Sequence, residues 1–193
     1  MKFTGDYVFQ NKIDEVWDKL NDPEVLKESI HGCKDFLEKE KNKFSLKIHI
    51  KIGPINANFA GDLEIKEIKP LNSYTIEANA TAGQLGGASG KVRINLVQQK
   101  QNTQLIYDAN AKINGKIAQL GARLIEGTVK KNTILFFNNF ERMLNKHEMK
   151  PKVNENKLQE VESQEKKDNF KRKYVYLVVL FFLALSIYIT NNG

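Results

Sequence analysis

Hydrophobic and polar residues alternate with two different periods along the first three quarters of the 193-residue chain. Residues 2–10 alternate as a strand does, and four apolar residues then recur at the spacing of one helix face: Ile13, Val16, Trp17 and Leu20. Asn11 is the expected N-cap of this short helix. A second short helix is expected after Asp22-Pro23, since an N-cap followed by proline is a typical helix start, and Gly32 should end it.

A period of two then continues to about Ile113, which is typical of strands with one buried face. In residues 44–52, for example, apolar residues alternate with serine, lysine and histidine. Turn residues at 53–54, 70–73 and 100–102 separate the strands at hairpin-like spacing. About six further strands should therefore pair antiparallel.

After Gly115 the helical spacing returns for about 30 residues. The apolar stripe is nearly continuous and comprises Ile117, Leu120, Gly121, Leu124, Ile125, Val129, Phe136, Phe137, Phe140 and Leu144. One long helix is expected to cover the apolar face of the sheet. The order of elements predicts an α+β domain over residues 1–146, in which a curved antiparallel sheet of about seven strands grips a long C-terminal helix.

Small residues gather at positions that should face this helix. Ala78 and Ala80 share one face of a strand, and residues 83–90 are nearly all small, without the Lys-Ser/Thr ending of a phosphate loop. A sheet face of small residues and the helix that covers it either pack closely or leave space for an apolar ligand. These residues alone leave both interpretations open. The candidate lining residues of such a cavity are Leu46, Ile48, Phe59, Ala78, Ala80, Tyr107, Ala109, Leu120 and Leu124.

The C-terminal part of the chain has a different character. Residues 174–190 (YVYLVVLFFLALSIYIT) contain no charge, glycine or proline, and as a helix they would span roughly 25 Å, near the thickness of a bilayer core. Three basic residues, 171–173, precede this run, so the positive-inside rule places the preceding domain in the cytoplasm. Residues 147–173 should form a flexible charged linker with an r.m.s. span of about 25–30 Å. Because residues 1–10 do not resemble a signal peptide, we expect a tail-anchored, single-pass protein of the cell membrane.

Charge and cysteine content exclude several classes of protein. The net charge is +7, and residues 1–150 contain 23 basic and 18 acidic residues. Lysine is interleaved with glutamate and no nucleic-acid-binding motif is recognisable, so no nucleic-acid partner is expected, whereas the basic residues before the anchor suit anionic lipid headgroups. The single cysteine excludes an intrachain disulfide, and three scattered histidines argue against a metal site.

His31 and Cys33 are the pair of residues that most suggests nucleophilic chemistry. A Cys–His dyad needs a thiolate and a base in contact, with a third group that orients the base. The sequence contains no recognisable orienting carboxylate or oxyanion hole. We therefore assign no catalytic residue and do not expect an enzyme.

Five segments agree in order and spacing with a known family: Asn21-Asp22-Pro23-Glu24-Val25-Leu26, Ile30-His31-Gly32-Cys33, Lys51-Ile52-Gly53-Pro54-Ile55, Tyr74 within a strand, and GKIAQLGARLI at 115–125. Together they resemble the family of the carbon monoxide dehydrogenase G subunit, of the START/polyketide-cyclase-like (SRPBCC) helix-grip superfamily. The resemblance covers about residues 1–144. The family usually has proline where this chain has His31, and some members carry a C-terminal hydrophobic segment.

The resemblance implies a non-catalytic accessory protein that recruits a molybdenum hydroxylase (molybdo-hydroxylase) of the carbon monoxide dehydrogenase type to the membrane. Its partners would be that enzyme, membrane lipid and a hydrophobic small molecule. A quinone, either menaquinone or ubiquinone, is the expected ligand, and no covalently bound cofactor is expected. The alternatives are a lipid or small-molecule carrier without a dehydrogenase partner, and an enzyme of the cyclase or hydrolase type.

Overall fold

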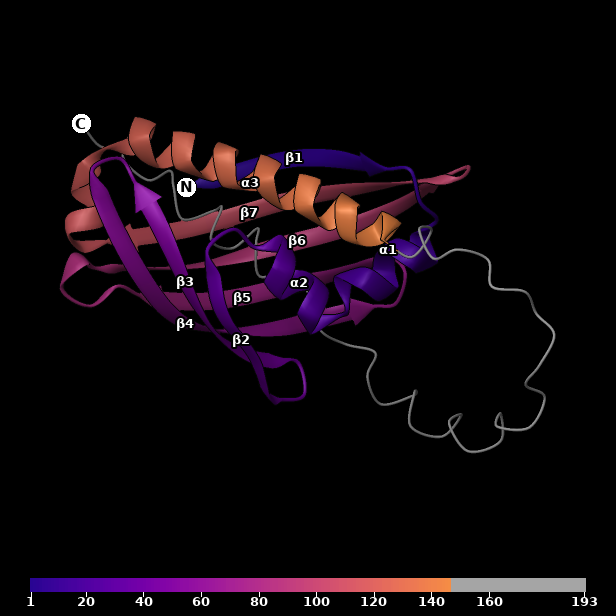
Figure 1. Cartoon of the computed structure of the whole chain (residues 1–193), viewed down its shortest axis with the longest axis horizontal. Helices are drawn as coiled ribbons and strands as arrows, with labels where there is room; N and C mark the ends of the chain where they lie inside the picture. The colour runs from indigo at the N-terminus through magenta and orange to yellow at the C-terminus, as the bar shows by residue number, and fades with distance from the viewer. Residues whose placement is uncertain (147–193) are drawn as a thin grey trace.

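The structure is a computed structural model and describes residues 1–146. These residues form a single antiparallel sheet covered by helices (Figure 1). The elements in chain order are β1 (Lys2–Phe9), α1 (Ile13–Leu20), α2 (Pro23–Ser29), β2 (Cys33–Glu40), β3 (Lys43–Ile52), β4 (Ile55–Lys69), β5 (Ser73–Thr81), the short 3-10 helix η1 (Gly83–Leu85), β6 (Gly87–Gln99), β7 (Asn102–Asn114), the 3-10 helix η2 (Gly115–Leu120) and α3 (Ala122–Asn145). The strand order β1-β7-β6-β5-β4-β3-β2 makes a meander of β2–β7 with β1 added beside β7. The seven-stranded sheet and closing helix predicted from the sequence are confirmed.

The first strand closes the sheet against the last one. Lys2 lies opposite Asn110 and Phe9 lies opposite Thr103 in the antiparallel register of β1 and β7. The amino group of Met1 donates a hydrogen bond to the carbonyl oxygen of a β7 residue, Ala111, at 2.9 Å. The start of the chain is therefore fixed to the last strand of the sheet.

The two short helices begin as helix-capping rules lead one to expect, with one correction. Asp22 caps α2 by accepting from the backbone nitrogens of Glu24 and Val25 at 3.1 and 3.4 Å. The N-cap of α1 is Lys12 rather than Asn11. Asn11 is engaged otherwise, because its carbonyl oxygen accepts from the Thr103 hydroxyl of β7 at 2.8 Å.

The closing helix starts later than its apolar stripe suggests. Gly121 has a φ of +85° and separates η2 from α3, so the stripe from Ile117 onward is two elements rather than one. Leu124 is not on the buried face of α3, because it lies about 100° around the helix from the buried Ile125. Its side chain is 46% exposed.

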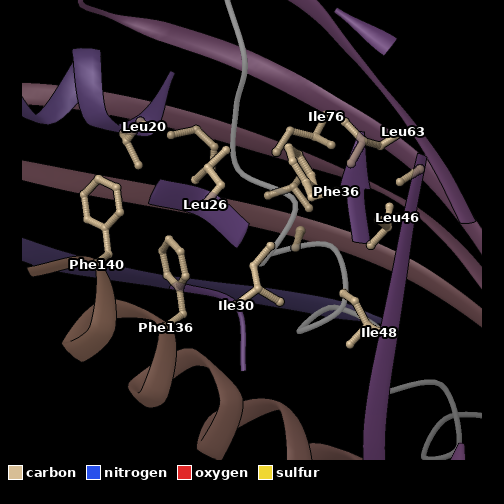
Figure 2. Close-up of a cluster of buried hydrophobic side chains, with 14 of the residues drawn as sticks. Leu20, Leu26, Ile30, Phe36, Leu46, Ile48, Leu63, Ile76, Phe136 and Phe140 are labelled. Atoms are coloured by element: carbon tan, nitrogen blue, oxygen red, sulfur yellow. The ribbon is translucent and has the colours of Figure 1, made fainter. Parts of the chain in front are cut away.

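Aromatic residues of α3 fill the core beside the two short helices. Figure 2 shows Phe136 and Phe140 projecting from α3 toward Leu20 and Leu26 of α1 and α2. Phe9 packs edge-on against Phe140 with ring centroids 5.3 Å apart. These residues belong to one hydrophobic cluster that takes in all seven strands and three α-helices, so residues 1–146 have a complete core of their own.

Within residues 1–146, no helix has both the length and the apolar composition needed to cross a membrane. The charged linker expected at 147–173 and the anchor expected at 174–190 lie outside the described residues.

Two glycines should respond in opposite ways to a methyl group. A Cβ at Gly61 in β4 would collide with the carbonyl oxygen of Asn79 and come 2.7 Å from the Cβ of Ala80, whereas a Cβ at Gly127 in α3 has no neighbour within 4 Å. We expect Gly61→Ala to lower the free energy of unfolding by roughly 1–3 kcal/mol. Gly127→Ala should raise it by about 0.5–1 kcal/mol, because it removes backbone freedom from the unfolded chain. Urea denaturation measures both, and a destabilised Gly127→Ala would contradict the open surroundings of that site.

Candidate ligand-binding site

Seven small residues adjoin one another on the sheet face that α3 covers. The register brings Ala80 opposite both Gly61 and Ala88, and brings Ala78 opposite Gly90, which in turn lies opposite Ala111. Ala109 continues this surface two residues further along β7, since alternate residues of a strand share a face. We call this set the small-residue patch: Gly61, Ala78, Ala80, Ala88, Gly90, Ala109 and Ala111.

The patch lies toward the end of the sheet that carries three connections. These connections are the β3–β4 turn at Gly53-Pro54, η1 between β5 and β6, and η2 between β7 and α3. The backbones at Gly86 and Gly115 approach so closely that a Cβ on either one would strike the other connection. The backbone nitrogen of Gly87 also donates to the side-chain oxygen of Asn114 at 2.8 Å.

Apolar residues around this end are either buried or partly buried. Ile117 of η2 and Ile125 of α3 are buried in the same hydrophobic cluster as the small-residue patch. Partly buried apolar residues that pack against this cluster from the three connections and the adjoining strands are Ile55, Ala82, Leu85, Ile113 and Leu120. The surroundings of the patch are thus hydrophobic, with side chains of intermediate exposure at the rim.

The structure brings together six of the nine candidate lining residues. These six lie on the covered face of the sheet, and each has 7% or less of its surface exposed: Leu46, Ile48, Phe59, Ala78, Ala80 and Ala109. Leu120 lies in η2 and is partly buried against the core. Leu124 lies at the surface of α3, where its side chain faces the β3–β4 turn, 3.1 Å from the position of a Cβ on Gly53.

Tyr107, the ninth candidate, lies at the β1 edge of this face. Its ring covers Gly5, its partner in β1, so that a Cβ on Gly5 would overlap the phenol. Burial, together with the negative charge of Asp6, raises the pKa of Tyr107. Sequence alternation places Tyr107 on the correct face, but only the pairing of β1 with β7 gives its neighbours.

A second polar feature of the same edge has no obvious signal in the sequence. The hydroxyl of Tyr7 donates to a carboxylate oxygen of Glu141 at 2.9 Å, and its ring stacks on Phe137 with centroids 4.5 Å apart. Burial, followed by the contact with Glu141, raises the pKa of Tyr7 to about 12. The pair joins β1 to the C-terminal half of α3, which are 134 residues apart in sequence.

His31 and Cys33 do not form a dyad in this structure. The side chain of His31 is exposed in the turn after α2, whereas the Cys33 thiol is half-buried and donates to the carbonyl oxygen of Asp35 at 3.4 Å. Burial raises the pKa of Cys33 from 9.0 to about 11, with a smaller opposing effect of Lys27. The turn itself is closed by the backbone nitrogen of Cys33, which donates to Ile30 at 3.1 Å.

Two surface cavities lie within the described residues, and the lining of the first includes Ala78 and Gly90 of the small-residue patch. One, of about 590 Å³, is on the opposite face of the sheet, where the charged side chains of Lys43, Glu64, Glu77 and Lys91 project. The other, of about 340 Å³, is a shallow depression on the outer side of α3. Among residues 1–146, no three His, Cys, Asp or Glu side chains are grouped so that they could hold a metal ion.

Solved structures with a similar fold come from several bacteria. A conserved protein from Geobacillus kaustophilus is 28% identical, with a TM-score of 0.72 over 76% of this chain and 96% of that chain. The Zhui aromatase/cyclase from Streptomyces sp. R1128 is 13% identical, with a TM-score of 0.57 over 76% and 94% of the two chains. A protein from Thermus thermophilus is 11% identical, with a TM-score of 0.57 over 76% and 99%.

At 13% and 11% identity the last two likenesses show the fold alone. The comparison with curated proteins returns no match. The family model for CoxG, the G subunit of carbon monoxide dehydrogenase, matches residues 5–145, which include every helix and strand of the domain except the first residues of β1. The chain therefore belongs to the CoxG family of carbon monoxide dehydrogenase G subunits.

Proposed function

We propose that this protein binds a hydrophobic molecule between the small-residue patch and the start of α3. The observation that carries the proposal is the patch itself, seven small residues on a sheet face that large side chains fill elsewhere. Its surroundings are apolar, so the ligand would be held mainly by burial, at about 25 cal/mol for each Å² of apolar surface removed from water. The fold family, which includes an aromatase/cyclase, supports an internal site for a hydrophobic molecule.

The accessory role completes the proposal. The family name supports association with an enzyme of the carbon monoxide dehydrogenase type. The protein would recruit such a molybdenum hydroxylase to the cell membrane through residues 174–190 and hold an isoprenoid quinone, menaquinone or ubiquinone, that accepts its electrons. An isoprenoid quinone suits the site because its tail is wholly apolar.

Catalysis by the domain itself is not part of the proposal. An enzyme of the cyclase type needs polar groups in contact with its substrate. The six candidate residues gathered on the covered sheet face are alanine, leucine, isoleucine and phenylalanine. The phenol of Tyr107 lies against Gly5 at the edge strand, and the Cys33 thiol is held in its protonated form.

Purification of the full chain with its natural lipid tests the accessory role. The protein extracted from membranes of its own host should carry an isoprenoid quinone, detected by mass spectrometry, and should co-purify with a molybdenum-containing oxidoreductase. A bound phospholipid or other apolar molecule without any oxidoreductase would favour the carrier alternative. Preparations with neither ligand nor oxidoreductase would show the proposal to be wrong.

Replacing a small residue of the patch by a larger one distinguishes a ligand site from close packing of helix and sheet. Ala78→Leu should reduce the bound ligand at least about tenfold while changing the free energy of unfolding by less than about 1 kcal/mol, because leucine would enter the space of the ligand. If helix and sheet instead pack closely there, leucine should cost roughly 1–3 kcal/mol. Ala60→Leu, on the exposed face of β4, is the matched control and should leave ligand content unchanged.

The reactivity of Cys33 tests the absence of nucleophilic catalysis. A pKa of about 11 instead of 9.0 lowers the thiolate fraction at pH 8 about 100-fold. The greater basicity of such a thiolate recovers about tenfold, so native alkylation by iodoacetamide should be about tenfold slower than in urea. The chain contains one cysteine, so the rate reports this site alone. Faster alkylation of the native protein, with a midpoint below pH 9, would indicate an activated thiol and support the enzyme alternative.

A further inference from the structure

The outer side of α3 carries two large apolar residues exposed to solvent. Ile134 is 51% exposed and Leu124 is 46% exposed. At 100° per residue both project from the side of the helix opposite to the buried Phe136 and Phe140. Gly127 lies between them, and the shallow depression of about 340 Å³ at this point is lined by Gly127, Lys130, Lys131, Ile134 and Leu135.

Positive charge surrounds these apolar residues. The segment from Ala122 to Ile134 contains Arg123, Lys130 and Lys131 but a single acidic residue, Glu126. All three cations are exposed. The ion pairs formed among residues 1–146 do not include any of them.

On the opposite face of the sheet, lysines form ion pairs with nearby glutamates. Lys66 pairs with Glu77 at 2.6 Å and with Glu64 at 3.1 Å, and Lys91 pairs with Glu77 at 3.2 Å. The charge there is balanced locally, whereas the charge on α3 is not. A strongly cationic helix face with isolated apolar side chains is typical of a surface that binds anionic lipid.

The position of this face connects it to the proposed ligand site. Leu124 faces Gly53 in the β3–β4 turn, one of the three connections that surround the small-residue patch. Lys51, just before that turn, and Lys116 in η2 are also exposed and are likewise absent from the ion pairs among residues 1–146. The end of the domain through which a ligand would enter is therefore the end that carries unbalanced positive charge.

We propose that the outer side of α3, defined by Arg123, Leu124, Gly127, Lys130, Lys131 and Ile134, docks on the surface of an anionic phospholipid bilayer. Leu124 and Ile134 enter the boundary between headgroups and acyl chains, while the three cations contact lipid phosphates. The proposal rests on the proposed function and deepens it by naming the face through which the domain meets lipid. It does not depend on residues 174–190.

Charge favours lipid over the other possible occupants of this face. A second copy of the chain paired about a twofold axis would bring the cations of both helices together, which opposes association. A protein partner is generally held by anchor residues that are buried in well-packed pockets. The depression on this face is shallow, and the residues that define the face include one arginine, Arg123, and no aromatic residue. Anionic lipid neutralises the cations and buries the apolar side chains at once.

Vesicle sedimentation with residues 1–146 tests the docking surface. This fragment contains the complete core, and the match to the crystallised Geobacillus protein covers 96% of that chain. The fragment should bind vesicles of phosphatidylcholine with about 30% phosphatidylglycerol and should be released by high salt, with much weaker binding to phosphatidylcholine alone. Loss of two cations in K130Q/K131Q should weaken binding about 25-fold, taking about fivefold for each cation. Ile134→Ser should weaken it about fivefold, since half of an isoleucine side chain is involved.

Matched controls remove the same groups elsewhere. K39Q/K69Q removes two exposed lysines from β2 and β4, and Leu37→Ser removes a 58% exposed leucine from β2. Both controls should bind within about twofold of the unchanged fragment. Circular dichroism and thermal unfolding of each variant establish that the fold is intact.

Three results would overturn the docking proposal. The first is that the unchanged fragment does not bind anionic vesicles, and the second is that the α3 variants and the controls lose vesicle binding equally. The third is that the full chain with K130Q/K131Q loses its co-purifying oxidoreductase, while residues 1–146 with the same substitutions still bind vesicles normally. The last result would assign the face to a protein partner. Ligand content is measured separately on the purified full chain, so failure of docking and failure of ligand binding are distinguishable.

Discussion

The packing of three phenylalanines of α3 against the sheet is the contact on which the rest of the domain depends. Phe137 stacks on Tyr7, while Phe136 and Phe140 stack on each other and Phe140 meets Phe9 edge-on. Each aromatic pair contributes about 0.5–1.5 kcal/mol beyond the burial of its surface. Because Tyr7 and Phe9 belong to the first strand, this cluster holds the beginning and the end of the domain together.

The core is consequently unequal along the length of α3. Its C-terminal half is filled by rings and by residues of the two short helices, such as Leu20 and Leu26 (Figure 2). The start of α3 and η2 lie at the end of the sheet that carries the small-residue patch. A half filled by large rings next to a half with small side chains is a suitable arrangement for a site that must admit a molecule without unfolding the domain. The unbalanced charge of the outer side of α3 falls at the same end.

The local patterns in the sequence predict most of the fold for identifiable reasons. Alternation predicts which face of a strand is buried, and Asp22-Pro23 predicts the start of a capped helix. Both features depend only on residues that are neighbours in sequence. The start of α3 is misplaced by the pattern because Gly121 continues a helical stripe while its positive φ interrupts the helix.

Alternation also places six of the candidate site residues on one face. The position of Leu124 could not be predicted, because a stripe wide enough to include it spans both buried and exposed sides. The surroundings of Tyr107, and the bond between Tyr7 and Glu141, follow from pairing across more than 90 residues, which no local pattern contains.

The pairing of β1 with β7 also has a consequence for biosynthesis. The hydrogen bond from Met1 to Ala111 joins residues that are 110 positions apart, so the first strand leaves the ribosome long before its partner exists. Strands paired over such separations form slowly, because a long loop must close before the contacts form. While β2 to β6 are being made, Phe3, Tyr7 and Phe9 have no sheet to join, and β1 is an unpaired apolar edge of the kind that chaperones protect. The domain therefore completes its fold only after β7 and α3 have emerged from the ribosome.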